Sequence, residues 1–560
     1  MPEHAHPDPH HTGLALAQRG DLRAALPHLE EAATESPGVP AVWRDLALCR
    51  ERLGDLAGAR QAYERALALD PADDHAHAYL GDLLRQTGDL AAARTHLEQA
   101  CRLRPGDPGH LDLLARLYLD RGEEDEAESL WRRALALAPE HRPSLTNLGA
   151  LLKERERYEE AEALLRRALA LAPDHPQTLN NLGITLRRLG RLEESRACLE
   201  RGFERAPTDA RLLINLALTR HELGDLEGAL ALLDTWVTRH PHDPQARWTR
   251  SLTLLTLERY ARGWADYEAG LEAGERAPRA LPIRRWCGEP LGGKRLLLLA
   301  EQGLGDQIMF LGCLPDLLQR AGPEAEIHLE CDPRLAPLAA RSFPSVRVHG
   351  TRPDQPWSGP RPAADFILPL GSLPLHFRRR AEDFPGRPYL VPDPERVAFW
   401  RRRYQDLGGA PVIGISWRGG NREDRHKRSL PLADWGPVFA HGDCRFVDLQ
   451  YKGTGAERRL VASRFHTPLH HWPESDPFHK VDELAAQLAA CDGYLGVANA
   501  TAHLAGALGV PSLVLVPFVP SWRWGITGET TPWYTSVRLL RQPRPGDWGP
   551  VIREAARRLA

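Results

Sequence analysis

Residues 142–175, RPSLTNLGALLKERERYEEAEALLRRALALAPDH, and residues 176–209, PQTLNNLGITLRRLGRLEESRACLERGFERAPTD, are two copies of one pattern. The copies belong to a longer series in which proline returns at a constant spacing, at Pro37, Pro71, Pro105, Pro139, Pro173, Pro207 and Pro241. Self-similarity at a fixed period of this length indicates a solenoid, in which each copy is one supersecondary unit.

Three further positions of the repeat are occupied by the same kind of residue in successive copies, and each has a physical reason. Glycine, with Glu156 in the one missing place, ends a first helix where the turn needs a positive φ. Small residues follow where a second helix must approach closely, and leucine marks the inner face of the first helix. The glycines are Gly20, Gly54, Gly88, Gly122, Gly190 and Gly224; the small residues Ala25, Ala59, Ala93, Ala127, Ala161, Ser195 and Ala229; the leucines Leu46, Leu80, Leu114, Leu148, Leu182 and Leu216. Period and residues together are those of tetratricopeptide repeats.

The series predicts an α-solenoid over residues 13–272. Seven copies are clear, and an eighth is degenerate, from about Gln245 to Glu272, with Glu258 in place of the glycine. Because one helix pair cannot bury its apolar face alone, the copies are expected to stack into a superhelix with a concave groove.

Composition narrows the function classes. The net charge of −3 is too small to predict a nucleic acid or a membrane surface as the partner. The sequence contains no run of 18 apolar residues, so no membrane-spanning helix is expected. Residues 1–12 are rich in histidine and lack the apolar segment of a signal peptide. We expect a cytoplasmic protein whose residues 1–12 form a solvated tail, with metal binding by these histidines as the alternative.

Asparagine also recurs with the period. Asn147, Asn181 and Asn215 each precede the leucine of a first helix, and Asn180 lies beside Asn181. An amide offers one acceptor and two donors, which match an extended peptide backbone, so the four residues predict a peptide-binding ladder on the concave face. Equally, such amides can bridge neighbouring repeats without contacting any ligand.

The second half of the chain has a different pattern. Residues 273–290 predict a linker that packs at a domain edge. Short apolar runs then alternate with helical segments, as in doubly wound sheets. The expected strands are 294–300, 326–330, 346–348, 365–368, 411–417, 445–450, 493–497 and 511–516. They predict two Rossmann-like halves, residues 291–408 and 409–560, with a last helix over about 546–560 that braces the first half.

Particular segments of this half resemble one group of bacterial proteins. They are EQGLGDQIMFLGCLPDL (301–317), GISWRGGN (414–421), KRSLPL (427–432), FVDLQ (446–450) and ATAHLAGALGVPSLVLVPFVPSWRWG (500–525). The resemblance is to tetratricopeptide proteins that carry a GT-B glycosyltransferase domain related to the lipopolysaccharide heptosyltransferases. In plan the chain is also similar to protein O-GlcNAc transferases, whose repeats carry an asparagine ladder, and to flagellin glycosyltransferases.

The resemblance implies an enzyme with no cofactor, a nucleotide-sugar donor, and a protein acceptor such as flagellin along the repeats. Residues 291–560 contain no Asp-x-Asp, so a metal-independent mechanism is expected, in which cations and helix N-termini hold the diphosphate. The basic loop 418–429 supplies cations, although an ordinary solvated loop is the alternative. The donor-binding residues implied are Gly303, Gly305, Trp417, Lys427, Arg428, Ser429, Gln450, Asn499, Thr501, His503 and Arg523.

Asp306 is the candidate catalytic base, because it aligns with the Gly-Asp acid proposed for that role in the heptosyltransferases; as an alternative it caps its helix. One position departs from the family: relatives commonly read V-D-T-x-x-A-H-L, and this chain has Ala498 in place of the aspartate. His503 is equally compatible with a core position. Two other functions therefore stay open: a weakened transferase that serves as a protein-binding scaffold, or a transferase with a glycan acceptor.

Overall fold

The computed structural model describes residues 8–277, 279, 281–351, 361–419, 429–440 and 443–559. The chain divides into two compact units, Met1–Asn215 and Leu216–Ala560. No helix in the described ranges is long and apolar enough to cross a bilayer.

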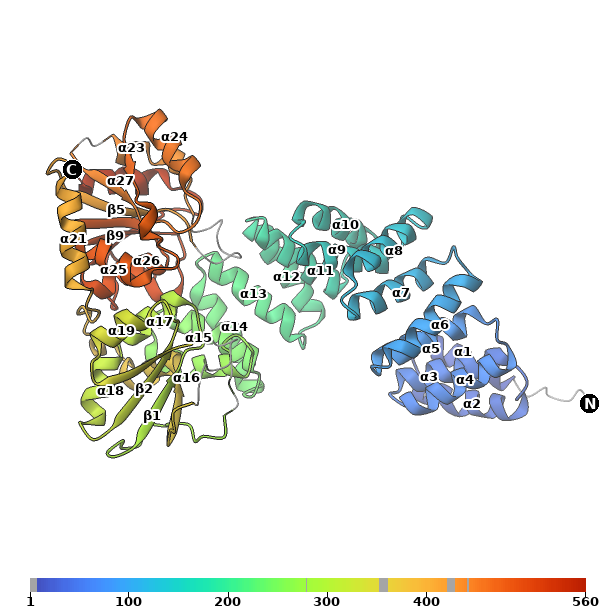
Figure 1. Ribbon diagram of the computed structural model, residues 1–560. Helices are drawn as coiled ribbons and strands as arrows, with labels where there is room; N and C mark the ends of the chain where they lie inside the picture. The colour runs from blue at the N-terminus through green and yellow to red at the C-terminus, as the bar shows by residue number, and fades with distance from the viewer. Residues whose placement is uncertain are drawn as a thin grey trace, which may run out of the picture. The chain divides into compact units, whose positions relative to one another are not determined.

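Sixteen helices form eight consecutive pairs, as the 34-residue period predicts (Figure 1). Their bounds are α1 Pro9–Gln18, α2 Leu22–Glu35, α3 Pro40–Arg52, α4 Leu56–Leu69, α5 Asp74–Gln86, α6 Leu90–Leu103, α7 Pro108–Asp120, α8 Glu124–Leu137, α9 Arg142–Glu154, α10 Tyr158–Leu171, α11 Pro176–Arg188, α12 Leu192–Arg205, α13 Ala210–Glu222, α14 Leu226–Arg239, α15 Pro244–Thr256 and α16 Tyr260–Tyr267.

The repeat registers have the structural roles that the sequence predicts. Every glycine of the turn register has a positive φ, and Glu156 adopts the same conformation at φ 60°. The small residues of the second helices, from Ala25 to Ala229, are fully buried. Gly183 shows how tight the pairs are, because a Cβ there would lie 2.5 Å from Leu199 Cγ. The predicted α-solenoid is confirmed.

The second unit contains two parallel sheets with helices around them, which confirms the predicted α/β architecture. The strands are β1 Arg295–Leu299, β2 Glu326–Cys331, β3 Val346–Gly350, β4 Phe366–Pro369, β5 Val412–Ser416, β6 Arg445–Asp448, β7 Leu469–His470, β8 Gly493–Val497, β9 Ser512–Val516 and β10 Val537–Arg541. The strand order is β3-β2-β1-β4 in one sheet and β10-β9-β8-β5-β6-β7 in the other. Strands such as β5 and β8 are buried at every position, as expected where helices cover both faces.

Helices connect the strands of both sheets (Figure 1). Their bounds are α17 Leu304–Leu311, α18 Leu314–Ala321, α19 Ala336–Ser342, α20 Leu373–Phe377, α21 Pro394–Gln405, α23 Gly436–Phe439, α24 Gly455–Phe465, α25 Val481–Ala490, α26 Ala500–Leu508 and α27 Gly549–Leu559, with a 3₁₀ turn at Trp522–Trp524. The prediction that the last helix braces the first half is wrong: α27 packs on α23 and β10. Its buried face, which includes Val551 and Ile552, completes the apolar core of the second sheet with Trp435 and Phe439.

The segment between the repeats and β1 packs on the first sheet. Arg285 forms a parallel bridge with Ile367 of β4, and Trp286 N donates to Ile367 O at 2.9 Å. Arg276 is fully buried and donates from two nitrogens to Glu301, at 2.9 and 2.8 Å. Because the last repeats belong to the same compact unit as the sheets, the unit boundary lies inside the repeat array rather than at residue 272.

Candidate functional site

Both sheets have a switch point, where the strand order reverses direction. In the first sheet β1 lies between β2 and β4, and in the second β5 lies between β6 and β8. Ligands of open α/β sheets bind outside the carboxyl ends of the strands at such points. The segments that follow β1, β5 and β8 contain most of the residues that the sequence predicts for the donor site.

Asp306 lies in the first turn of α17, directly after β1. The N-cap of this helix is Gly303, so Asp306 does not cap it, in contrast to the alternative considered from the sequence. Arg523 Nε donates to Asp306 Oδ1 at 2.6 Å, and the guanidinium carbon of Arg523 lies 4.4 Å above the Trp522 ring. The predicted base and one predicted donor-binding residue are thus in direct contact, with side chains 20% and 22% exposed.

Gly305 brings the two halves of the unit together. A Cβ at this position would lie 3.4 Å from both Ala500 Cα and His503 Cδ2, which is ordinary van der Waals contact, so the first turns of α17 and α26 lie next to each other here. Gly303 is not crowded, since a Cβ there would meet only Asp306 Oδ2, at 3.7 Å. Because both contacts fall near helix N-termini, the partial positive charges of two helices lie close together.

Asn499 is the N-cap of α26. Its Oδ1 accepts from Ala502 N at 3.0 Å, while its Nδ2 donates to Ser416 Oγ at 2.8 Å and to Arg418 O at 3.2 Å. The amide therefore joins the carboxyl ends of β5 and β8 at the switch point. Thr501, in the first turn of the same helix, is buried.

The loop after β5 is fixed at its base. Gln450 Oε1 accepts from Trp417 N at 2.9 Å and from Arg418 N at 2.8 Å. Ser429 Oγ accepts from Gly419 N at 3.1 Å, which holds the two ends of the loop together. The predicted phosphate ligands Lys427 and Arg428 lie outside the described residues.

His503 is a core residue in this structure. It is 4% exposed, its Nδ1 lies 3.0 Å from Tyr534 Oη, and its ring stacks on Trp524 at a centroid distance of 4.6 Å. Burial raises the pKa of Tyr534 well above its ordinary value, so its hydroxyl stays protonated. This pair of side chains packs behind the contact between α17 and α26.

The sequence reasoning missed a buried carboxylate at the end of β6. Asp448 accepts from Thr454 Oγ1 at 2.5 Å and from Gln450 N at 3.0 Å, and burial raises its pKa. His471 Nδ1 lies 3.6 Å from Asp448 Oδ2. Aspartate at the end of an apolar strand, in FVDLQ, was the available signal.

In the repeats, the asparagine amides contact the preceding repeat. Asn147 Nδ2 donates to Asp112 Oδ1 at 3.0 Å, and Asn215 Nδ2 donates to Asn180 Oδ1 at 2.9 Å. Lys153 Nζ donates to Asn181 Oδ1 at 3.4 Å. These contacts bridge neighbouring repeats, which is one of the two roles that the sequence suggests for the asparagines. Peptide binding by the same amides stays a prediction.

Comparison with protein-family models matches the repeat half of the chain. A model described as the C-terminal domain of cilia and flagella-associated protein 70 matches residues 10–174, and tetratricopeptide-repeat models match residues 151–212 and 210–235. The first half is a tetratricopeptide array, an architecture that presents an extended surface to peptides and proteins.

Two curated proteins are similar to this chain. Protein FlbA of Caulobacter vibrioides is 36% identical over 326 residues, which cover 55% of this chain and 54% of FlbA. A TPR repeat-containing protein of Pseudomonas aeruginosa is 41% identical over 56 residues, 10% of this chain and 53% of that protein. The chain thus spans about half the length of the curated relatives that it matches.

Solved tetratricopeptide structures are similar at low identity. The repeat protein of Parabacteroides merdae is 20% identical, with a TM-score of 0.35, over 42% of this chain and 93% of that chain. YrrB, described as a TPR protein with an unusual peptide-binding site, is 18% identical with a TM-score of 0.26, over 33% of this chain and 95% of its own.

Proposed function

We propose that this chain is a metal-independent GT-B glycosyltransferase that holds a protein acceptor along its repeats and moves a sugar to it from a nucleotide-sugar donor. The observation that carries the proposal is the Asp306–Arg523 pair beside the switch points of two parallel sheets. A carboxylate and a cation lie together there, and open α/β sheets bind nucleotides at such points.

In the proposed reaction, an acceptor hydroxyl attacks the anomeric carbon of the donor. The bond from that carbon to the diphosphate oxygen breaks, and Asp306 takes the hydroxyl proton. The nucleoside diphosphate leaves with the electron pair, and its charge is stabilised by Arg523 and by the N-termini of α17 and α26. Lys427 and Arg428 are the other cations proposed to contact the phosphates.

The contact between Asp306 and Arg523 suggests an order of binding. While Arg523 donates to Oδ1, that oxygen is occupied and does not contact an acceptor hydroxyl. A diphosphate competes for the same guanidinium, since Arg binds phosphate with two parallel hydrogen bonds. In this proposal, donor binding withdraws Arg523 and prepares Asp306, so the donor binds before the acceptor.

The test combines donor binding with product formation. The full chain is incubated with UDP-, ADP-, GDP- and CMP-sugars and with candidate acceptors such as flagellin, and intact mass is measured. For the productive donor, Asp306→Asn should lower kcat by roughly 10²–10⁴-fold with donor affinity within a few-fold of the parent. Arg523→Ala should mainly weaken donor binding, and Asp547→Asn, an exposed loop position, is the control. Full turnover by Asp306→Asn would remove Asp306 as the base.

A second function, a protein-binding scaffold without transfer, is favoured by Ala498. This residue is 4% exposed and belongs to the apolar core, so the end of β8 offers no carboxylate at the position where relatives have one. Absence of both nucleotide binding and transfer with every donor would establish the scaffold and exclude the enzyme. Transfer to free oligosaccharides but not to proteins would instead establish a glycan acceptor.

The role of the asparagines needs its own measurement. Replacing Asn147, Asn181 and Asn215 together by alanine should weaken binding of the protein acceptor. Because all three amides contact a neighbouring repeat, urea unfolding of the variant must accompany the binding assay. Unchanged acceptor affinity in a folded triple variant would leave the asparagines a structural role alone.

A further inference from the structure

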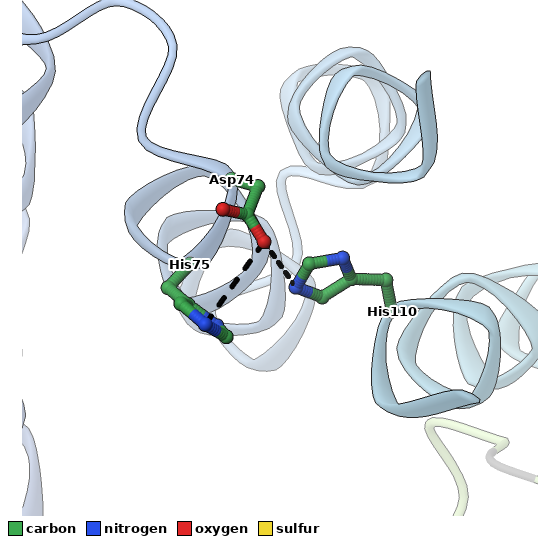
Figure 2. A group of neighbouring side chains, drawn as sticks. All are labelled: Asp74, His75 and His110. Atoms are coloured by element: carbon green, nitrogen blue, oxygen red, sulfur yellow. Dashed lines mark ion pairs between the residues drawn. The ribbon is translucent and has the colours of Figure 1, made fainter. Parts of the chain in front are cut away.

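A cluster of two histidines and one aspartate lies in the first unit, within the repeats (Figure 2). Asp74 and His75 are the first two residues of α5, and His110 is the third residue of α7. Asp74 Oδ2 lies 3.5 Å from His110 Nε2 and 4.0 Å from His75 Nε2. Figure 2 shows both rings turned toward this carboxylate oxygen, from the first helices of the third and fourth repeats.

His110 is the unusual member of the cluster. Its side chain is buried, and neither ring nitrogen has a hydrogen-bond partner among the described residues. Asp74 Oδ2 is likewise buried without a hydrogen bond. Buried polar groups are nearly always satisfied, so Asp74 Oδ2 and His110 Nε2, two such atoms that face each other at 3.5 Å, suggest that a further group binds between them.

The repeat register shows that His110 is not required for packing. The equivalent positions in the other repeats, all buried, are Val42, Ala76, Ser144, Thr178, Leu212 and Ala246. Small or apolar side chains therefore fill this position elsewhere in the array. Asp74 is similarly out of pattern, since Pro40, Pro108, Pro176 and Pro244 occupy its register in four other repeats.

The donor set and its spacing fit a transition metal. Zinc binds imidazole nitrogen and carboxylate oxygen at about 2.0–2.2 Å, so tetrahedral ligand atoms lie roughly 3.3 Å from one another. Asp74 Oδ2 lies 3.5 and 4.0 Å from the two imidazole nitrogens, and the three ligand atoms all lie within 4.8 Å of one another. A bound metal would therefore draw the side chains together by up to about 1.5 Å.

We propose that Asp74 Oδ2, His75 Nε2 and His110 Nε2 form a binding site for a divalent transition metal, with Zn²⁺ as the best match. Three protein ligands leave the fourth tetrahedral position to water or to a group from a bound partner. Because the ligands come from α5 and α7, the metal would clamp two consecutive repeats.

Arg104 competes with the metal for the same atoms. Its NH1 donates to His75 Nε2 at 3.1 Å, and its NH2 lies 3.2 Å from Asp74 Oδ1. The Arg104 side chain is 52% exposed, so it can turn into solvent when a cation binds. This competition predicts moderate affinity, and it provides a variant that should bind the metal more tightly.

The experiment is a titration of the full chain with Zn²⁺ by calorimetry and with Co²⁺ by visible absorption. We expect one Co²⁺ per chain with the intense bands of tetrahedral coordination. His110→Val should weaken binding at least 10-fold, and it is a conservative test because Val42 occupies the same register. Arg104→Gln should strengthen binding several-fold.

The four histidines of residues 1–12 are a separate source of metal binding, and a variant with all four replaced by serine is the control. It should retain the tetrahedral Co²⁺ spectrum, whereas His110→Val should lose it. Zn²⁺ should also raise the unfolding temperature of the parent chain and leave that of His110→Val unchanged. Equal affinity and equal spectra for the parent and a folded His110→Val variant would overturn the proposal.

Discussion

At the scale of single residues, Asn499 combines two stabilising roles. Replacement by alanine removes the cap of α26, worth about 1 kcal/mol, and the hydrogen bond to Ser416, worth about 1 kcal/mol more. We expect Asn499→Ala to lower the free energy of unfolding of the second unit by about 2 kcal/mol in urea titrations.

Asp225 provides the matched control. It caps α14 in the same unit by accepting from Gly228 N at 3.0 Å, and its carboxylate, 47% exposed, lies 3.9 Å from Arg220 NH1. Because an exposed ion pair contributes little, Asp225→Ala should cost about 1 kcal/mol, mainly from the lost cap. Equal losses for the two variants would mean that the link between β5 and β8 adds nothing.

His376 should make stability depend on pH. Burial lowers its pKa to about 4, with Arg320 and Arg285 acting in the same direction and Glu289 opposing them. The unfolded chain binds this proton near pH 6.5, and the folded chain binds it only near pH 4. The unfolding free energy should therefore fall as pH drops from 6.5 to 4.

The measurement is the slope of unfolding free energy against pH in that window. His376→Gln should make the slope shallower, because the folded and unfolded states no longer differ at this position. His242→Gln, at an exposed loop histidine, is the control and should leave the slope unchanged. Identical slopes for the parent and His376→Gln would contradict this prediction.

Individual site residues could be predicted where they belong to a recognisable sequence motif. The contacts between these residues could not be predicted. Asp306 and Arg523 were each predicted from a local pattern, yet they lie 217 residues apart in the chain. Only the folding of two sheets joins them. The same holds for His110, whose ring meets Asp74 because consecutive first helices pack together, a relation that the linear sequence does not display.

At the scale of elements, the turn between the helices of each pair is strained wherever glycine is absent. Gly190 has φ 78° with open space around its Cα, so Gly190→Ala tests the backbone alone. We expect a loss of about 1 kcal/mol in the free energy of unfolding of the repeats. Glu156→Gly should give a smaller gain, about 0.5 kcal/mol, because glycine also stabilises the unfolded chain.

Gly38 is the matched position for these variants. It also has open space around it but no positive φ, so Gly38→Ala should be neutral or stabilising in the same urea titrations. Destabilisation of similar size by Gly38→Ala and Gly190→Ala would show that conformation at the turn is not the cause.

Elements with a strong pattern were predictable. The repeat registers predicted the helix pairs, although α1 begins at Pro9, inside the residues 1–12 that were expected to form a tail. Short, mostly apolar runs placed eight strands within a few residues of their bounds. Two strands were not predicted. β7 has only two residues, and β10, VRLLR, carries an arginine in its interior, although β3 was predicted with Arg347 at such a position.

At the scale of the whole molecule, the described apolar cores lie within one compact unit each. The core of the sheets begins at Leu255, whereas the repeat cores around Leu80 and Leu148 involve the first unit. A fragment that starts at Pro176 should therefore keep the unfolding midpoint of the second unit within about 2 °C, measured by near-ultraviolet circular dichroism. Under the proposed function, it should still hydrolyse the donor and should transfer sugar to protein less efficiently, because it keeps Asn180, Asn181 and Asn215 but lacks Asn147 and the first five repeats.

The full chain, unfolded under the same conditions, is the reference for this fragment. A fall of more than 10 °C in the midpoint would show that the early repeats are part of the stabilising structure of the sheets. Transfer to protein at the full rate would show that the first five repeats do not hold the acceptor.

The architecture could be predicted from the sequence, and the division into units could not. Periodicity ends where the repeats end, so it suggested a boundary near residue 272. Compactness depends on packing across the chain, and the buried Arg276 and Glu301 pair ties the segment after the repeats to the loop that follows β1. Such an ion pair has no local sequence signature.

The bridge between Arg285 and β4 has a practical consequence for self-association. Ile367 N donates to Arg284 O and Ile367 O accepts from Trp286 N, both at 2.9 Å, so the connecting segment shields that border of the sheet. An exposed border strand is a template for pairing with another molecule, and it leads to aggregation. A recombinant fragment cut at residue 291 would uncover β4 and leave Glu301 without its counter-ion, whereas one that begins ahead of Arg276 should remain monodisperse.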